Sequence, residues 1–306
     1  MKKALITGSE GFIGQHLARE MEANGYEVVR CSKDGGEGYV AMNILDAAQV
    51  LSVIREQQPD VLINMAGQAN VALSWKIPAL TVSLNVNGLV NILEAVRQVK
   101  PEMRVVAVGS SDEYGSLEGR GVNVTEDIPI HPMTPYAVSK VAQENLAQAY
   151  VRAYHLNVCM IRCFNLGGSL QPKGYMVSDF ASGIAEVEAG KKEFLSVGNL
   201  DSARDFTHVR DAARACRLIA EKGRVGEIYN VSSGVTYTAR EILDRLLALA
   251  SCPVEVRQDP ARMRPSDTPV VCGNHDKLTR DTGYAPALSV DAMLSDALEY
   301  WRGQVG

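Results

Sequence analysis

Tyr136 and Lys140 are the residues whose types and spacing point most directly to chemistry. They stand four positions apart in the run Tyr-Ala-Val-Ser-Lys, so on a helix their side chains lie on one face. A nearby ammonium favours tyrosinate, and we therefore expect Lys140 to lower the pKa of Tyr136 towards working pH. Such a phenol can give a proton to a developing alkoxide or take one from an alcohol. The pair predicts a proton-transfer site.

Two serines, Ser110 and Ser111, follow residues 105–109, an apolar segment typical of a buried strand. Side chains at the carboxyl ends of strands in a parallel sheet line the ligand crevice. Either hydroxyl could hydrogen-bond a reacting carbonyl oxygen and stabilise its developing charge. The alternative is a serine-rich turn without a catalytic role.

Three glycines, Gly8, Gly11 and Gly14, stand between a short apolar strand and the first amphipathic helix, where Phe12 and Ile13 follow the second glycine. Glycines allow a tight turn and close approach of the backbone to a pyrophosphate, and the helix N-terminus supplies free N–H groups. This strand-turn-helix context predicts that Gly8, Gly11, Phe12, Ile13 and Gly14 bind a dinucleotide. A purely structural turn is the alternative.

The end of the second predicted strand, residues 27–31, indicates which dinucleotide is bound. An acidic residue there would bind a ribose 2′-hydroxyl, but the chain has Ser32 and Lys33, with Asp34 one position further. A hydroxyl beside a cation suits a 2′-phosphate better, which favours NADP(H) over NAD(H). Alternatively, Lys33 is a solvated loop residue and the protein uses both cofactors.

The elements that must position these residues alternate between strand and helix. The apolar patterns predict strands at 3–7, 27–31, 61–65, 105–109 and 158–164, and helices at 12–24, after Asp46, at 80–99 and at 136–154. Strict alternation implies a parallel sheet wound by right-handed crossovers. We therefore expect an α/β fold with a Rossmann-type doubly wound parallel sheet.

The composition of the sequence changes after Phe164, and residues 165–175 are rich in Gly, Ser and Pro. A predicted strand at 227–232 returns the chain to the sheet. We expect residues 1–165 plus about 207–233 to form the NADP-binding Rossmann domain. Residues of about 166–206 and 234–306 should form a smaller, discontinuous α/β lobe that binds the substrate.

Length, composition and charge exclude several classes of protein. The chain has 306 residues, 46% of them apolar, and a formal net charge of −5, which argues for a folded protein and against nucleic acid or a membrane surface as partner. No uninterrupted apolar run approaches about 18 residues, so no membrane-spanning helix is expected. Six cysteines without a C-x-x-C pair predict reduced thiols and a cytoplasmic protein. No metal site is expected.

These motifs together resemble the extended short-chain dehydrogenases/reductases that act on nucleotide sugars. The resemblance spans nearly the whole chain. It rests on the glycine loop, Ser110-Ser111, Tyr136 with Lys140, Asn64-Met65-Ala66-Gly67, Asn85, Arg162-Cys163-Phe164-Asn165, Arg204-Asp205-Phe206-Thr207 and Tyr229-Asn230-Val231. It implies that the cofactor is contacted by Ser32, Lys33, Asn43, Ile44, Met65, Ala66, Gly67, Asn85, Tyr136 and Lys140.

Within that family, the chain is most similar to reductases of GDP-4-keto-6-deoxy-D-mannose. This similarity rests on residues 197–200, 258–267 and 282–286. It implies NADPH-dependent reduction of the C4 ketone, in which Tyr136 protonates the oxygen, Ser110 with Ser111 holds the carbonyl, and Lys140 binds the nicotinamide ribose. GDP-D-rhamnose is the expected product, and the talose-type epimer is the alternative. The implied substrate contacts are Ser110, Ser111, Asp112, Asn165, Val177, Arg204, Arg264, Ser266 and Asp267.

Some positions depart from the family pattern. Asn43 stands where relatives often have an aspartate that contacts adenine, and Leu166 and Ser169 replace a usual His and Pro. Asp112 stands where a 4,6-dehydratase carries a longer glutamate as an additional acid/base, which favours a simple reductase. The alternatives are a GDP-sugar 4,6-dehydratase, a nucleotide-sugar 4-epimerase and, outside enzymes, a nucleotide-sensing subunit.

The resemblance also implies an assembly. Relatives form homodimers by packing two long helices of each copy into a four-helix bundle. In this sequence those helices are about 80–99 and 136–154.

Overall fold

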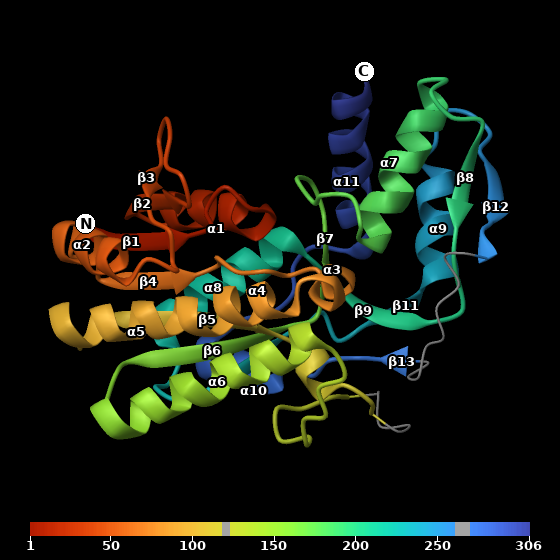
Figure 1. Ribbon diagram of the computed structural model, residues 1–306. Helices are drawn as coiled ribbons and strands as arrows, with labels where there is room; N and C mark the ends of the chain where they lie inside the picture. The colour runs from red at the N-terminus through yellow and green to blue at the C-terminus, as the bar shows by residue number, and fades with distance from the viewer. Residues whose placement is uncertain (118–122, 261–269) are drawn as a thin grey trace.

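A seven-stranded parallel sheet forms the centre of the computed structural model, which describes residues 1–117, 123–260 and 270–306 (Figure 1). Its order is β10-β6-β5-β4-β1-β2-β3. These strands are β1 (Lys2–Thr7), β2 (Tyr26–Ser32), β3 (Val40–Ala41), β4 (Val61–Asn64), β5 (Arg104–Ser110), β6 (Val158–Cys163) and β10 (Ile228–Val231). The chain runs outward in one direction from β1 and then in the other from β4, so the crevice between their carboxyl ends is the expected ligand position.

Helices cover both faces of the sheet, which confirms the predicted doubly wound α/β fold. One face carries α1 (Phe12–Ala23) and α8 (Val209–Lys222), and the other carries α2 (Ala47–Gln57), α5 (Gly88–Val99) and α6 (Pro135–Tyr154). Alternate strand residues supply the two cores. In β1, Ala4 and Ile6 pack towards α1 and α8, whereas Leu5 packs towards α2 and α5.

The predicted helix at 80–99 forms part of a longer helical segment with an irregular turn. It consists of α4 (Pro78–Val82), a π-helical turn η1 (Ser83–Asn87) and α5. The Pro78–Val99 segment is 22 residues long and contains an 18-residue stretch with a mean hydropathy of 1.3, of which 44% is buried. By length and composition alone it could cross a membrane, contrary to the expectation from uninterrupted apolar runs. Its buried side has a protein partner, because it packs on α2, α6 and the sheet.

A second lobe stands beside the carboxyl ends of the central strands (Figure 1). Its helices are α7 (Met176–Glu188), α9 (Ala239–Ala248) and α11 (Val290–Val305), which share one apolar core. Its strands form two small sheets, and they are β7 (Asn165–Gly167), β8 (Phe194–Val197), β9 (Ala203–His208), β11 (Thr236–Thr238), β12 (Glu255–Gln258) and β13 (Val270–Val271). A short helix, α3 (Val71–Lys76), precedes α4.

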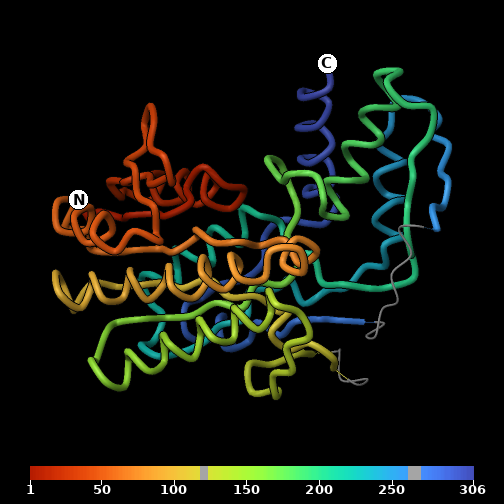
Figure 2. The backbone as a smooth tube through the Cα atoms, in the orientation of Figure 1, coloured from red at the N-terminus to blue at the C-terminus, as the bar shows by residue number. Residues whose placement is uncertain are grey.

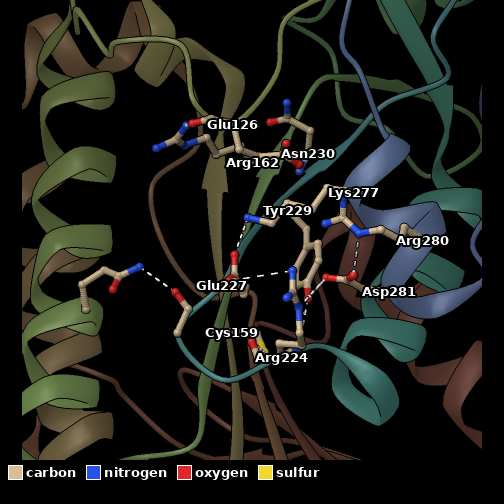
Figure 3. A network of polar contacts seen from close by, with 12 residues as sticks. Glu126, Cys159, Arg162, Arg224, Glu227, Tyr229, Asn230, Lys277, Arg280 and Asp281 are labelled. Carbon is tan, nitrogen blue, oxygen red and sulfur yellow. Dashed lines mark hydrogen bonds and ion pairs between the residues drawn. The ribbon is translucent and has the colours of Figure 1, made fainter.

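The C-terminal part of the chain contributes helices to both lobes, so the domain boundary differs from the predicted one. We expected all of 234–306 in the second lobe, but α10 (Asp276–Thr282) packs on α8 and β10, and Leu278 lies in the core beneath the sheet. Figure 2 shows the blue trace at both places, with α10 below the sheet and α11 in the second lobe. Polar contacts fix α10: Asp281 accepts from Tyr229 at 3.0 Å and from Arg224 at 2.8 Å (Figure 3).

Candidate active site

The glycine loop has the close backbone packing that a pyrophosphate cradle requires. Gly8 has a φ of +59°, and a Cβ added there would lie 2.9 Å from the Ala66 backbone. A Cβ at Gly14 would lie 2.3 Å from the Gly8 carbonyl oxygen. Gly11 precedes α1 without a side-chain cap, so the first N–H groups of this helix are available to an anion. These residues therefore fit a dinucleotide.

A cavity of about 240 Å³ lies beside the loop and suits the adenosine half of a dinucleotide. Of the predicted cofactor residues it is lined by Gly8, Gly11, Lys33, Asn43, Ile44, Met65, Ala66 and Gly67. Ser32 is not in this lining. Its side chain is buried, and its hydroxyl donates to the Gly35 carbonyl at 3.2 Å. Lys33 is therefore the residue that could meet a 2′-phosphate.

A second, larger cavity of about 510 Å³ joins the glycine loop to the predicted chemical site. Of the predicted residues it is lined by Gly8, Gly11, Phe12, Ile13, Gly14, Met65, Gly67, Ser110, Ser111, Asp112, Tyr136, Lys140, Asn165 and Val177. The cofactor loop, the proton-transfer pair and five residues predicted to contact substrate thus open into one space. We call it the main cavity.

Tyr136 and Lys140 reach the main cavity from the start of α6. The Thr134 side chain caps this helix and Pro135 is its first residue, a combination that favours helix initiation. Lys140 Nζ lies 5.9 Å from the Tyr136 ring centroid. Nζ donates to the Val108 carbonyl at 2.7 Å and to Gln143 Oε1 at 3.1 Å, so the lysine is held between β5 and its own helix.

The expected lowering of the Tyr136 pKa is wrong for the protein without a cofactor. Burial raises the pKa of Tyr136, the negative charge of Asp112 raises it further, and only a hydrogen bond with Ser110 opposes them. Lys140 directs its N–H groups to Val108 and Gln143 instead of to the phenol. The phenol therefore keeps its proton, as a donor to a ketone oxygen must.

Ser110 lies at the end of β5, where the chain turns into the 3₁₀ helix η2 (Ser111–Tyr114). Its Oγ accepts from the Asp112 N–H at 3.2 Å, and its own N–H donates to Glu113 Oε1 at 2.8 Å. These two bonds fix the serine from its side chain and from its backbone. Because Ser110 also hydrogen-bonds Tyr136, a substrate oxygen could meet both hydroxyl groups together.

Asn85 does not line either cofactor cavity, unlike the other predicted contacts near it. It lies in the π-helical turn and is 1% exposed. Its amide accepts from the Gln68 N–H at 2.8 Å and donates to the Gln68 carbonyl at 3.0 Å and to Ser139 Oγ at 2.8 Å. Asn85 therefore ties the turn after β4 to the catalytic helix α6, and its role is positional.

The predicted substrate contacts differ in where they lie relative to the main cavity. Asn165 and Val177 line the main cavity, whereas Arg204 does not. Arg204 still acts on the site electrostatically, because its charge lowers the pKa of Asp112 while burial raises it. Three further predicted contacts, Arg264, Ser266 and Asp267, lie outside the described residues.

Several residues that line the main cavity were not predicted from the sequence. They come from the segment between β4 and α3, from the loop that leads into α7 and from β9, and they include Gln68, Val71, Gln171, Tyr175, Met176 and Phe206. The Gly- and Pro-rich composition of residues 165–175 signalled a loop at this point, but not which of its side chains turn inward. Among the described residues, no group of His, Cys, Asp and Glu could hold a metal ion.

A further cavity of about 460 Å³ lies between α7 and β8 in the second lobe. Its lining includes Asp179, Ser182 and Gly183 of α7 and Ser196 of β8. The first turn of the same helix, at Met176 and Val177, lines the main cavity. A ligand that lies along α7 could therefore reach both spaces.

Comparisons with known proteins agree on one family. The sequence profile of the GDP-mannose 4,6 dehydratases matches residues 5–297. The GDP-6-deoxy-D-mannose reductase of Pseudomonas aeruginosa is 29% identical over 99% of this chain and 98% of its own length. A dTDP-glucose 4,6-dehydratase of Xanthomonas campestris is 31% identical over 80% of this chain and 75% of its own. The solved structure of RMD from Pseudomonas aeruginosa with NADPH has a TM-score of 0.91 at 28% identity, covering 99% of this chain and 100% of that one.

Proposed function

This chain belongs to the GDP-mannose 4,6 dehydratase family, and on that premise we propose that it reduces the C4 ketone of GDP-4-keto-6-deoxy-D-mannose with NADPH. The observation that carries the proposal is the main cavity, which brings the glycine loop together with Ser110, Tyr136 and Lys140. The likeness over nearly the full length to a GDP-6-deoxy-D-mannose reductase, and to RMD bound to NADPH, supports the same reaction. GDP-D-rhamnose is the proposed product.

In the proposed reduction, each of several residues has a separate role. When bound, NADPH supplies the hydride. Ser110, with Ser111 beside it, holds the carbonyl oxygen and stabilises the charge that develops on it. Tyr136 gives its phenolic proton to that oxygen. The Lys140 ammonium stabilises the phenolate that remains, since a nearby positive charge favours the ionised form. Lys33 faces the adenosine cavity, where it would meet the 2′-phosphate of NADPH.

The GDP part of the substrate is proposed to lie along α7. The sugar would occupy the main cavity beside Val177, and the nucleotide would extend towards the cavity between α7 and β8. The Arg204 guanidinium suits a diphosphate, because its planar fork can bind two oxygens. Asn165 would contact the sugar nucleotide from the edge of the main cavity.

A 4,6-dehydratase is the second candidate, and Asp112 is the observation that favours it. This carboxylate lines the main cavity, and burial raises its pKa, as an acid that holds a proton requires. Its side chain is one methylene shorter than the glutamate expected in that role. The reductase therefore remains our proposal.

One assay separates these functions. The protein is incubated with NADPH and GDP-4-keto-6-deoxy-D-mannose, and separately with GDP-mannose and NADP⁺ or NAD⁺, while the absorbance of the reduced cofactor and the sugar products are followed. We expect NADPH to be consumed in proportion to a GDP-6-deoxyhexose, and only with the keto-sugar. Conversion of GDP-mannose to a 4-keto-6-deoxy sugar without net formation of the reduced cofactor would instead identify a dehydratase. Epimerisation without cofactor consumption would identify an epimerase, and binding without turnover would identify a sensor.

We further propose that the protein forms a cytoplasmic homodimer in which α4–α5 and α6 of each copy build a four-helix bundle. Large apolar side chains on these helices and on adjoining α3 are exposed, among them Trp75 (63%), Leu80 (46%) and Val138 (49%). A second copy of the chain would cover them. The cytoplasmic location is supported by the six cysteines, all of them free thiols, and cell fractionation tests it.

A further inference from the structure

Gln171 has a buried acceptor that no other group of the protein uses. Its side chain lines the main cavity, and the residue is only 4% exposed. Nε2 donates to the Leu166 carbonyl oxygen at 2.8 Å, whereas Oε1 has no hydrogen-bond partner within the part of the chain that the structure describes. A buried acceptor without a partner costs free energy, so its presence in a native protein needs an explanation. A ligand in the main cavity would supply the partner.

The bond to Leu166 determines which end of the Gln171 amide lacks a partner. A carbonyl oxygen accepts hydrogen bonds and never donates them, so Nε2 must face Leu166. Turning the amide over would place two acceptors against each other. Oε1 is therefore the end without a partner, and the group that it needs is an N–H or O–H donor.

Gln68 lines the same cavity and shows how the protein pairs a glutamine amide internally. Its Nε2 donates to the Asn70 carbonyl oxygen at 2.8 Å, and its Oε1 accepts from the Asn70 N–H. Both ends of this amide are thus satisfied by one neighbouring residue. The unpaired Oε1 of Gln171 is therefore not common to the amides that line the cavity.

The backbone that precedes Gln171 is held from both lobes. Ser169 donates its N–H to Asp296 Oδ2 of α11 at 2.7 Å, and its carbonyl accepts from His16 Nε2 of α1 at 3.0 Å. Leu170 then has a φ of +69°, a left-handed conformation that a bulky residue rarely adopts. Such strain persists only where surrounding contacts maintain it, and it is concentrated at functional sites. These contacts hold Gln171 in the lining of the main cavity.

We propose that Gln171 is a ligand-binding residue of the main cavity, whose Oε1 accepts a hydrogen bond from an uncharged N–H or O–H group of the ligand. The inference rests on the proposed function for the identity of the ligands, which bring two such donors. One is the carboxamide N–H of the nicotinamide ring, and the other is a hydroxyl of the hexose. A site built to bind a donor discriminates against an analogue that lacks it.

The first arm of the test compares NADPH with its 3-acetylpyridine analogue. An acetyl group there replaces the carboxamide, so the carbonyl remains but the N–H groups are lost. Calorimetry without a sugar substrate gives both Kd values. If the carboxamide is the donor, the wild type should bind NADPH about fivefold more tightly than the analogue. Gln171→Met should bind the two equally.

The second arm uses the sugar nucleotide in the presence of NADP⁺. GDP-D-rhamnose is compared with analogues that lack the C2 or the C3 hydroxyl, again by calorimetry. If a sugar hydroxyl is the donor, one of these analogues should bind to the wild type about fivefold more weakly than GDP-D-rhamnose. Gln171→Met should remove that difference.

A second variant and a matched control make the test decisive. Gln171→Lys keeps an N–H donor for the Leu166 carbonyl but removes the acceptor, so it should lose the same preference if Gln171→Met does not fold. Its added charge acts equally on each ligand and its analogue and cancels in the ratio of their Kd values. In α6, outside the lining of the main cavity, Gln148 also donates from Nε2 to a backbone carbonyl, that of Gly226 at 2.7 Å. Gln148→Met should leave every ratio as in the wild type.

The proposal is wrong if the wild type has neither preference, or if both Gln171 variants keep the preferences of the wild type. Failure of the proposed function would give a different result. A wild type that prefers NADPH to the acetyl analogue through Gln171, but reduces no keto-sugar, would refute the reduction and leave the assignment of Gln171 in place.

Discussion

Tyr136 works in surroundings that keep its phenol protonated. Burial and the nearby Asp112 both raise its pKa, so the tyrosine is built to give a proton away and not to begin as a base. The spacing of Tyr136 and Lys140 correctly predicted that both would face one cavity, but the sequence could not reveal the direction of the pKa shift. That direction depends on burial and on Asp112, which only the fold brings near.

Replacing Tyr136 by Phe removes the proposed proton donor and leaves the ring in place. We expect kcat for the keto-sugar to fall by about 10²- to 10⁴-fold, with little change in NADPH affinity measured by fluorescence. Tyr154→Phe is the matched control, because Tyr154 lies on the same helix but is 49% exposed. Wild-type turnover by Tyr136→Phe would show that the proton comes from another group.

At the scale of elements, the structure shows which features periodicity can predict. The strands β1, β4 and β5 and the helices α1 and α6 follow from apolar patterns. Helix α2 follows from its apolar face and its cap Asp46, whose side chain accepts from the Gln49 N–H at 3.0 Å. The π-helical turn at Asn85 was not predictable, because it depends on contacts with Gln68 and Ser139 that are distant in sequence. The same is true of α10, whose partners are α8 and β10.

Asn85→Ala tests the positional role of the π-helical turn. The change leaves the buried Gln68 backbone and the Ser139 hydroxyl without their partner, and we expect a loss of about 2–3 kcal/mol in the free energy of unfolding. Urea denaturation measures it. Asn87→Ala, at an exposed position of the same turn, should cost less than about 0.5 kcal/mol. Equal losses of unfolding free energy in the two variants would contradict the proposed role of the Asn85 hydrogen bonds.

Glu188 of α7 and Arg302 of α11 hold the second lobe together. They pair at 2.7 and 2.8 Å, and this pairing, with the Ser251 N–H, lowers the pKa of Glu188 from 4.5 to about 2. A lowered carboxyl pKa stabilises the fold above the unfolded value, and this contribution is lost as pH falls from about 4.5 towards 2. We expect Glu188→Gln to lose about 1 kcal/mol at neutral pH, allowing for solvent screening.

Urea denaturation at several pH values tests the predicted direction of this pH dependence of stability. The difference between wild type and Glu188→Gln should shrink as the pH falls below about 4.5. A difference that stays constant down to pH 3 would mean that the pair contributes through packing and not through charge.

At the scale of the whole molecule, the exposed apolar side chains of α3, α4 and α6 set the expected assembly. Val138→Asp places a charge in the proposed dimer interface, so the protein should sediment as a monomer at micromolar concentration. Val235→Asp is the control, because Val235 is 51% exposed but precedes β11 in the second lobe, and it should remain dimeric. A wild-type protein that sediments as a monomer would contradict the proposed assembly.

The net charge of the protein is also a property of the whole molecule. The formal net charge of −5 gave no indication that the proposed ligands, NADPH and a GDP-linked sugar, are both polyanions. Binding of such small anions depends on a few local groups and not on the net charge of the chain. The glycine-loop amides and Lys33 face the cofactor cavities, and Arg204 acts on the substrate side through Asp112. Bulk charge therefore bears on nucleic acid and membranes as partners, and the local fold determines which small anions bind.

The central claim is that hydride passes from NADPH to C4 of a GDP-linked 4-keto-6-deoxy sugar. Its most direct test is a reaction with NADPH that carries deuterium at the transferring position, followed by NMR of the sugar product. The account predicts one deuterium at C4 of a GDP-6-deoxyhexose for each NADPH consumed. Product without deuterium at C4, or deuterium retained in the cofactor, would contradict it.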